Sequence, residues 1–296
     1  MIGAVDIGGT KFAVGMVSHD GQVLARAETP SFPERGAADG LRRICQLLQE
    51  TATQVGEPLE GIGVGCTGPV NPLTGKLGLI SFLPGWEGLN LVDLLEHRFG
   101  VRLAIENDAD AAALGEAAWG AGRDAKRFIY VTVSTGIGGG MVFDGQLYRG
   151  VAGSHPEIGH HVIEPSGPPC FCGARGCWER MASGPALAER GHRPSAQEVC
   201  AAARHGDPLA REAIEQEGFY LGVGLANLVT LFVPDIIALG GGVMQSLDLF
   251  IERIEATIKA TCGLVPHEKT RVLPAMLGRD TGLVGAARVW IQRCEL

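Results

Sequence analysis

The feature that most constrains the fold is an internal repeat of a β-hairpin. Residues 15–24 read Gly-Met-Val-Ser-His-Asp-Gly-Gln-Val-Leu, and residues 140–148 repeat the pattern with one residue fewer, as Gly-Met-Val-Phe-Asp-Gly-Gln-Leu-Tyr. In both copies a strand-like run and a glycine-rich turn come first, and an Asp-Gly turn typical of hairpins follows the second strand. The repeat predicts two similar domains, each opening with a hairpin that presents a glycine loop. The alternative is a chance similarity, because Asp-Gly turns are common.

Strand and helix patterns alternate along the rest of the chain. The predicted helices cover residues 41–55, 91–99, 109–119, 185–192, 196–205, 208–232, 246–261 and 282–294. The predicted strands outside the hairpins cover residues 61–66, 101–105 and 235–239. This alternation is typical of the α/β class.

Length and composition narrow the class further. At 296 residues the chain exceeds the usual single-domain size, so we expect two α/β domains with an interdomain cleft: residues 1–107 with 282–296, and residues 108–281. A formal net charge of −8 argues against a nucleic-acid partner. The eight cysteines have no disulfide-framework spacing, and neither a signal peptide nor a membrane-spanning run is readable. A reduced, cytoplasmic protein without a membrane partner is expected.

Three glycine clusters follow predicted strands. They are residues 8–11, just after Asp6, residues 134–140 and residues 240–242. Glycine lets backbone N–H groups approach a phosphate without obstruction by Cβ. The first cluster matches neither phosphate-binding fingerprint of the G-x-x-x-x-G-K or G-x-G-x-x-G type, and by itself it could serve only the hairpin. Three clusters at three strand ends together predict a polyphosphate site.

A carboxylate next to an amide follows another strand. Asn107 and Asp108 come at the end of the strand 101–105 and immediately before a helix. A carboxylate that accepts a hydroxyl proton, beside an amide that donates and accepts, suits a polyol substrate. The alternative is that Asp108 is only the N-cap of the helix.

One imidazole and three thiols gather in a short segment. His160 is followed by Cys170, Cys172 and Cys177, which is a set that satisfies the tetrahedral N/S preference of zinc. A closed four-ligand site performs no hydrolysis, so its expected work is to hold His160 and the nearby acids 157 and 179 toward a substrate. The alternative is a structural zinc knuckle remote from the site, and the role of the neighbouring His161 stays open.

In combination, these motifs resemble the ROK family of sugar kinases and repressors. The segments that carry the resemblance are residues 6–11, 106–109, 133–140, 157–160 and 170–179. The resemblance implies an actin-like, ribonuclease-H-like ATPase fold whose two domains close on ATP and a hexose. It also implies Mg²⁺ with the nucleotide, a structural Zn²⁺, and Asp108 as the base that takes the proton from the sugar hydroxyl.

The remaining site residues follow from the same resemblance. The implied sugar ligands are Gly68, Asn107, Asp108, Glu157, His160 and Glu179. The implied nucleotide-site residues are Asp6, Gly8, Gly9, Thr10, Lys11, Thr135, Gly136, Gly241 and Gly242. The implied zinc ligands are His160, Cys170, Cys172 and Cys177.

The identity of the sugar is less clear than the reaction. The sequence His155-Pro156-Glu157 resembles the fructokinase branch of the family, whereas the three-cysteine segment and Glu179 resemble glucokinases and N-acylhexosamine kinases. We expect an ATP-dependent kinase acting on the primary hydroxyl of glucose to give the 6-phosphate, with fructokinase or N-acylhexosamine kinase as alternatives. The sequence leaves open the preferred hexose, the phosphoryl donor and the role of His155, as well as the choice between a homodimer and a homotetramer.

A sugar-sensing regulator without catalysis is the alternative from another class. Such relatives carry an N-terminal helix-turn-helix, but here the segment of the first glycine loop begins at Asp6 and no basic recognition helix precedes it. A noncatalytic remnant would also be expected to lack Asp108 or the glycines, and this chain has both.

Overall fold

The computed structural model describes residues 1–294, which form two compact units. The first unit contains Met1–Arg123, Gly140–His155 and the chain from Met276 onward, and the second contains Asp124–Gly139 and Pro156–Ala275. The sequence placed the boundary before Asp108, whereas internal contacts group residues 108–123 and 140–155 with the N-terminal part. Residues 295–296 of the expected first domain lie outside the described residues.

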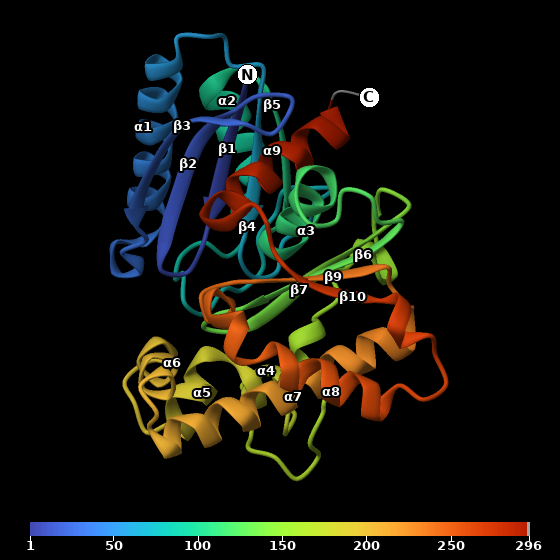
Figure 1. The fold of residues 1–296 in the computed structure, drawn as a ribbon. Helices are drawn as coiled ribbons and strands as arrows, with labels where there is room; N and C mark the ends of the chain where they lie inside the picture. The colour runs from blue at the N-terminus through green and yellow to red at the C-terminus, as the bar shows by residue number, and fades with distance from the viewer. Residues whose placement is uncertain (295–296) are drawn as a thin grey trace. The chain divides into compact units, whose positions relative to one another are not determined.

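A five-stranded sheet forms the frame of the first unit. Its strands are β1 (Ile2–Ile7), β2 (Lys11–Val17), β3 (Val23–Pro30), β4 (Gly61–Cys66) and β5 (Arg102–Asn107). Their order is β3-β2-β1-β4-β5; β1, β2 and β3 pair antiparallel, and β1, β4 and β5 pair parallel (Figure 1). Parallel pairing places the carboxyl ends of β1, β4 and β5 at one edge of the sheet, which is where α/β proteins bind ligands.

Four helices cover the two faces of this sheet. They are α1 (Gly36–Val55), α2 (Leu91–Phe99), α3 (Asp108–Trp119) and α9 (Thr281–Cys294). Buried residues of α1 and α2, such as Ile44 and Leu95, form one core with Ile62 and Val64 of β4. On the other face, α9 contacts β1, β4 and β5 and packs closely on α3 (Figure 1).

Strand β4 shows how the sequence produces these two faces. Side chains alternate across a strand, so Ile62 and Val64 point to one side and the glycines between them to the other. A Cβ on Gly63 would lie 1.8 Å from the carbonyl oxygen of Ala286, and one on Gly61 would lie 2.0 Å from the ring of Trp290. The glycine face of β4 therefore accepts the backbone of α9 directly.

Glu116 fixes the chain where it enters and leaves the first unit. This carboxylate on α3 is fully buried. Its oxygens accept backbone N–H bonds from Ala121 at 2.9 Å, Met276 at 3.1 Å and Leu277 at 2.9 Å. Ala121 lies just before the crossing at residues 123–124, and Met276 follows the crossing at 275–276. One buried carboxylate thus holds two connecting segments against α3.

The second sheet repeats the strand order of the first. Its strands are β6 (Arg127–Val133), β7 (Ile137–Phe143), β8 (Gln146–Leu147), β9 (Ile236–Gly240) and β10 (Arg271–Pro274). Read from β8, the order is β8-β7-β6-β9-β10, which matches β3-β2-β1-β4-β5 strand for strand. The parallel pairs β6–β9 and β9–β10 match β1–β4 and β4–β5. The prediction of two similar α/β halves from the repeated hairpin is confirmed.

The helices of the second unit lie together on one side of the second sheet (Figure 1). They are α4 (Trp178–Ala182), α5 (Gly184–Arg190), α6 (Ala196–Arg204), α7 (Pro208–Phe232) and α8 (Ile251–Thr261). The helix expected over 246–261 was too long, because residues 243–249 form a 3₁₀ helix with a non-helical Ser246 and the α-helix begins only after the buried Phe250. Within residues 1–294, a helix with the length and hydrophobicity to span a bilayer is not found.

Candidate active site

The first glycine loop is a tight turn between β1 and β2. The N–H of Gly8 donates to the carbonyl of Lys11 at 3.0 Å, and Ser31 holds the loop from outside through its hydroxyl, which donates to the carbonyl of Gly9 at 2.6 Å. A Cβ on Gly9 would lie 2.7 Å from the ring of the exposed Phe82, so a side chain at this position would require that ring to move. Thr10 and Lys11 are exposed. The loop is preformed, and its polar side chains face solvent.

The catalytic candidate lies where β5 passes into α3. The side chain of Asn107 accepts from the N–H of Ala109 at 2.9 Å and of Asp110 at 3.3 Å, so Asn107 is the N-cap and Asp108 is the first helical residue. Within residues 106–110, Asp108 is the one residue that is not buried. The alternative of Asp108 as a mere cap does not match this geometry, because its neighbour performs that task.

Two carboxylates share this edge of the first sheet. The register aligns Ile7 of β1 with Cys66 of β4 and Cys66 with the N-cap residue of α3. Asp6 and Asp108 therefore lie at the ends of the two strands that flank β4. Burial, followed by the negative charge of Asp108, raises the pKa of Asp6 to about 7. Gly68 follows β4 at the same edge with a φ of +80°, a conformation that favours glycine. The first unit therefore brings together the candidate base Asp108, the carboxyl group of Asp6 and the first glycine loop.

Glu179 lies on the second glycine loop. Its Oε2 accepts the N–H of Ile137 at 2.9 Å, and a Cβ on Gly136 would lie 2.3 Å from the same oxygen. Ser134 and Thr135 of this loop are exposed. The sequence assigned Glu179 to the sugar, and the structure adds that its carboxylate holds the start of β7 through a backbone hydrogen bond.

The third glycine cluster lies beside the second. Gly241, at the end of β9, has a φ of +91°, and its Cβ would meet the carbonyl oxygen of Val133 at 2.4 Å. A Cβ on Gly242 would lie 3.7 Å from the hydroxyl of Ser134. Two of the three predicted glycine loops therefore meet at the ends of β6 and β9 in the second unit.

The four expected metal ligands converge. The ligand atoms of His160, Cys170, Cys172 and Cys177 all lie within 4.8 Å of one another. The Sγ atoms of Cys172 and Cys177 are 3.5 Å apart, and Nδ1 of His160 lies 3.6 Å from Sγ of Cys170. Bonds of about 2.3 Å to sulfur and about 2.1 Å to nitrogen in a tetrahedron put such atoms about 3.6–3.8 Å apart. The set therefore fits one zinc ion.

Glycine allows the chain to turn around this cluster. Gly173 and Gly176 have φ values of +95° and +64°, which is the left-handed region that favours glycine. Glu157 is exposed and precedes the short 3₁₀ helix Ile158–His160. The N–H of His160 donates to the carbonyl of Glu157 at 3.0 Å and so closes this turn. A backbone hydrogen bond thus links Glu157 to His160, one of the four residues of the cluster.

The two histidines of open role have distinct partners. Nδ1 of His161 lies 2.5 Å from the carbonyl oxygen of Ile158, and its ring lies 5.4 Å from that of Trp178, so it belongs to the packing of its own segment. Nδ1 of His155 lies 2.7 Å from Oδ2 of Asp110. Asp110 and its partner Arg149 were missed from the sequence. The available signal was a charged residue in the otherwise apolar, alanine-rich start of α3.

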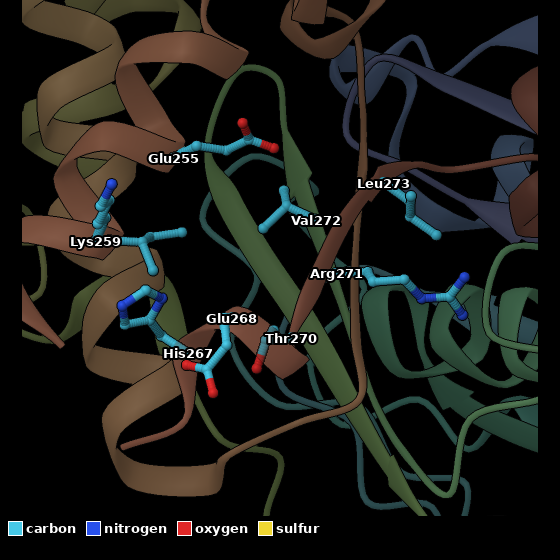
Figure 2. Close-up of a pocket in the computed structure, with 9 residues that line it drawn as sticks. Glu255, Lys259, His267, Glu268, Thr270, Arg271, Val272 and Leu273 are labelled. Carbon is cyan, nitrogen blue, oxygen red and sulfur yellow. The ribbon is translucent and has the colours of Figure 1, made fainter. Parts of the chain in front are cut away.

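A separate hollow lies between α8 and β10 of the second unit. It measures about 410 Å³ and is lined by Glu255 and Lys259 of α8, His267 of the following turn and Val272 of β10, among others (Figure 2). None of the predicted site residues lines it. Its charges are of both signs and it has no glycine loop, so it is not the phosphate site.

Comparison with known proteins identifies the family. The pattern of the ROK family matches residues 2–293, and the chain belongs to this family. It is 33% identical to a glucokinase of Thermotoga maritima over 310 aligned residues, which cover 98% of this chain and 96% of that protein.

Solved structures agree with this assignment. A ROK hexokinase from Thermus thermophilus superimposes with a TM-score of 0.83 at 33% identity over 97% of each chain. A ROK family glucokinase from Streptomyces griseus, crystallised with glucose and AMPPNP, superimposes with a TM-score of 0.84 at 33% identity over 97% of each chain. The fold is that of ROK kinases, of the actin-like ATPase type with two α/β sheets.

Proposed function

We propose that this protein is an ATP-dependent hexokinase that phosphorylates the primary hydroxyl of glucose. The observation that carries the proposal is the edge of the first sheet, where Asp108 is the one accessible residue of a buried strand-to-helix junction beside the first glycine loop. Phosphoryl transfer needs positioning, charge neutralisation and a base near the attacking hydroxyl more than covalent chemistry. Near full-length similarity to glucokinases supports glucose as the substrate.

In this proposal Asp108 accepts the proton of the 6-hydroxyl as that oxygen attacks the γ-phosphorus, while the bond from this phosphorus to the β–γ bridging oxygen breaks and ADP leaves. In the loop of Gly8, Gly9 and Thr10, the N–H of Gly8 closes the turn, and the N–H groups of Gly9 and Thr10 are assigned to the phosphates. The loop of Thr135 and Gly136 would offer further backbone N–H groups to the phosphates. Mg²⁺ bound with ATP would supply positive charge to the phosphate oxygens. Asp6 and Lys11 flank the first loop, and Gly241 and Gly242 lie beside the second and are assigned to the nucleoside.

The zinc site is proposed to act as a clamp. The donor set is closed, with one imidazole and three thiols, so a bound zinc has no open position for substrate. It would fix the loop on which Glu157 and His160 are placed, and Trp178 and Glu179 follow the last cysteine directly. We assign Glu157, His160 and Glu179, with Asn107 and Gly68, to the hydroxyl groups of the sugar.

A coupled assay across glucose, fructose, mannose, N-acetylglucosamine and N-acetylmannosamine with MgATP tests the proposal. The expected result is the highest kcat/KM for glucose and release of a hexose 6-phosphate. A higher kcat/KM for fructose would move the enzyme to the fructokinase branch. Glucose binding without phosphorylation of any of the five sugars would favour a regulator and refute the kinase proposal.

We further propose a cytoplasmic enzyme that works as a homodimer or homotetramer, with no nucleic-acid or membrane partner. The net charge of −8 supports the absence of a nucleic-acid surface. Light scattering coupled to size exclusion distinguishes the two assemblies, and a monomer at assay concentration would contradict both.

A further inference from the structure

Two carboxylates are buried on either side of the catalytic candidate. Glu106 is 1% exposed and Asp110 is 0% exposed, and Asn107 and Asp108 lie between them in the chain. Burial of a carboxylate is costly unless a cation or hydrogen-bond donors compensate for the lost water. The partners of these two groups therefore decide how firmly the junction between β5 and α3 is held.

Three basic side chains, from two separate parts of the chain, pair with these carboxylates. Arg149 forms ion pairs with both carboxylates, one through each terminal nitrogen. Arg293, in the last turn of α9, forms a second ion pair with Glu106. His155 approaches Asp110 with its Nδ1 2.7 Å from Oδ2. Burial raises the pKa of Glu106, and the guanidinium groups of Arg293 and Arg149 oppose that rise.

Two of these three side chains belong to one short segment. Arg149 and His155 are its first and last residues, and both contact the same carboxylate of Asp110. Between them the chain turns through a 3₁₀ helix at Val151–Gly153, and Val151 is 88% exposed. The segment is thus attached to α3 at its two ends, while its middle faces solvent.

The attachment lies next to both predicted catalytic elements along the chain. Asp110 is in the first turn of α3, two residues after Asp108. Glu157, a predicted sugar ligand, comes two residues after His155, and the intervening Pro156 has a fixed φ that leaves little slack. A change in the position of His155 would therefore be passed directly to Glu157.

We propose that His155 and Arg149 are positioning residues that bind the Asp110 carboxylate and so tie the segment leading to Glu157 to the helix that begins at Asp108. The start of α3 and the segment that ends at His155 are then held by one buried ion cluster. This inference rests on the proposed kinase function, because the roles of Asp108 and Glu157 are assigned there. It also gives His155 a task that is not direct contact with the sugar.

A purely structural role makes a different prediction. Asp110 keeps Arg149 as a partner when His155 is removed, so its carboxylate is not left unpaired and the fold should survive. If His155 only added stability, its loss would lower Tm and leave the kinetics below Tm unchanged. If it positions Glu157, the kinetics change first.

The experiment compares four variants with the wild type. Three are single substitutions, His155→Ala, His155→Asn and Asp110→Asn, and the fourth combines His155→Ala and Asp110→Asn in one protein. The control is His97→Ala, an exposed histidine of α2 in the same unit. Each protein is assayed for kcat, for KM of glucose and of ATP, for the Kd of glucose without nucleotide, and for Tm. Hydrogen exchange over residues 150–158 reports on the segment without any turnover.

The expected result is a loss of about 100-fold in kcat/KM for glucose in His155→Ala, since misplacing a reacting group by about 1 Å has that effect. The KM for ATP stays within about twofold of wild type, as in His97→Ala. His155→Asn recovers most of the loss, because an amide N–H can donate to Asp110 from the same place. The double variant loses no more than the worse single variant, as expected for residues that act through one contact.

Two outcomes would overturn the inference in an active enzyme. The first is wild-type kinetics together with wild-type hydrogen exchange in His155→Ala. The second is a double variant whose loss equals the sum of the two single losses in free energy, together with a His155→Asn variant that is as impaired as His155→Ala. A wild type that phosphorylates no hexose would instead refute the proposed function. In that case faster exchange over residues 150–158 in His155→Ala, but not in His97→Ala, would still support the anchor, and unchanged exchange would overturn it.

Discussion

Replacing Asp6 by asparagine should stabilise the unliganded protein at neutral and alkaline pH. In the folded chain, burial and the charge of Asp108 raise the pKa of Asp6 from 3.8 to about 7. Between these values the folded protein binds a proton that the unfolded chain has released, so the free energy of unfolding falls as pH rises through this window. Asparagine has nearly the same size and no charge to bury, and it removes this penalty.

The magnitude follows from the window. About three pH units at about 1.36 kcal/mol each give a penalty on the order of 4 kcal/mol above pH 7. The N-terminus of α9 reduces this penalty. Gly282, at the start of α9, is so close to Asp6 that a Cβ there would lie 2.3 Å from its Oδ2. A helix N-terminus stabilises a nearby carboxylate by about 0.3–1 kcal/mol and at most about 2 kcal/mol. The penalty is larger than this gain, so about 2 kcal/mol or more should remain.

Thermal unfolding from pH 4 to pH 9, without nucleotide or Mg²⁺, measures the effect. At roughly 2–4 °C per kcal/mol, Tm of Asp6→Asn should exceed that of wild type by at least about 4 °C at pH 8, and the gap should close toward pH 4. Asp20→Asn is the control, because a hydrogen bond from Ser18 lowers the pKa of the exposed Asp20. The charged form of Asp20 is therefore stabilised by folding, and its replacement should lower Tm at pH 8 instead of raising it. Equal Tm values at pH 8, or a more stable wild type, would refute the reasoning.

Three further substitutions test separate parts of the structure. Cys172→Ser should lower zinc content and raise the KM for glucose together, whereas a zinc-free wild type with full activity would remove the clamp. Glu116→Gln should destabilise by about 1–3 kcal/mol in denaturant unfolding, because an amide cannot accept all three N–H bonds; an unchanged midpoint would contradict the pinning role. Gly63→Ala should unfold the first unit or cost several kcal/mol, since its Cβ would overlap the carbonyl of Ala286, while Gly263→Ala, at a position open to solvent, should change little.

The sequence predicted those elements whose signals are local. Strand β4 was predicted with its observed bounds, because glycine, isoleucine and valine alternate between flanking turn residues. Its pairing with α9 was not predicted, because the helix that fills the glycine face is about 220 residues away in the chain. Strand β10 was missed since its four residues are half-buried or exposed at the sheet edge and end in proline.

The candidate site divides in the same way. Asp108, the glycine loops and the Cys-His cluster could be named because each is a compact motif at a strand end or a tight turn. The charges around them could not, because Glu106 and Asp110 find their partners at Arg149 and Arg293 only after the chain has folded. A buried ion pair between distant residues leaves no periodic trace in the sequence, and its members look like surface charges until the structure places them.

The most direct test of the central claim is the rate of glucose phosphorylation by Asp108→Asn. The amide keeps the size of the side chain and some hydrogen bonding, but it cannot take the hydroxyl proton, so kcat should fall by about 10²–10⁴ while glucose still binds measurably. Asn107 remains the cap of α3, so the helix itself should be preserved. A variant that retains most of the wild-type kcat would contradict the assignment of Asp108 as the base and, with it, the proposed mechanism.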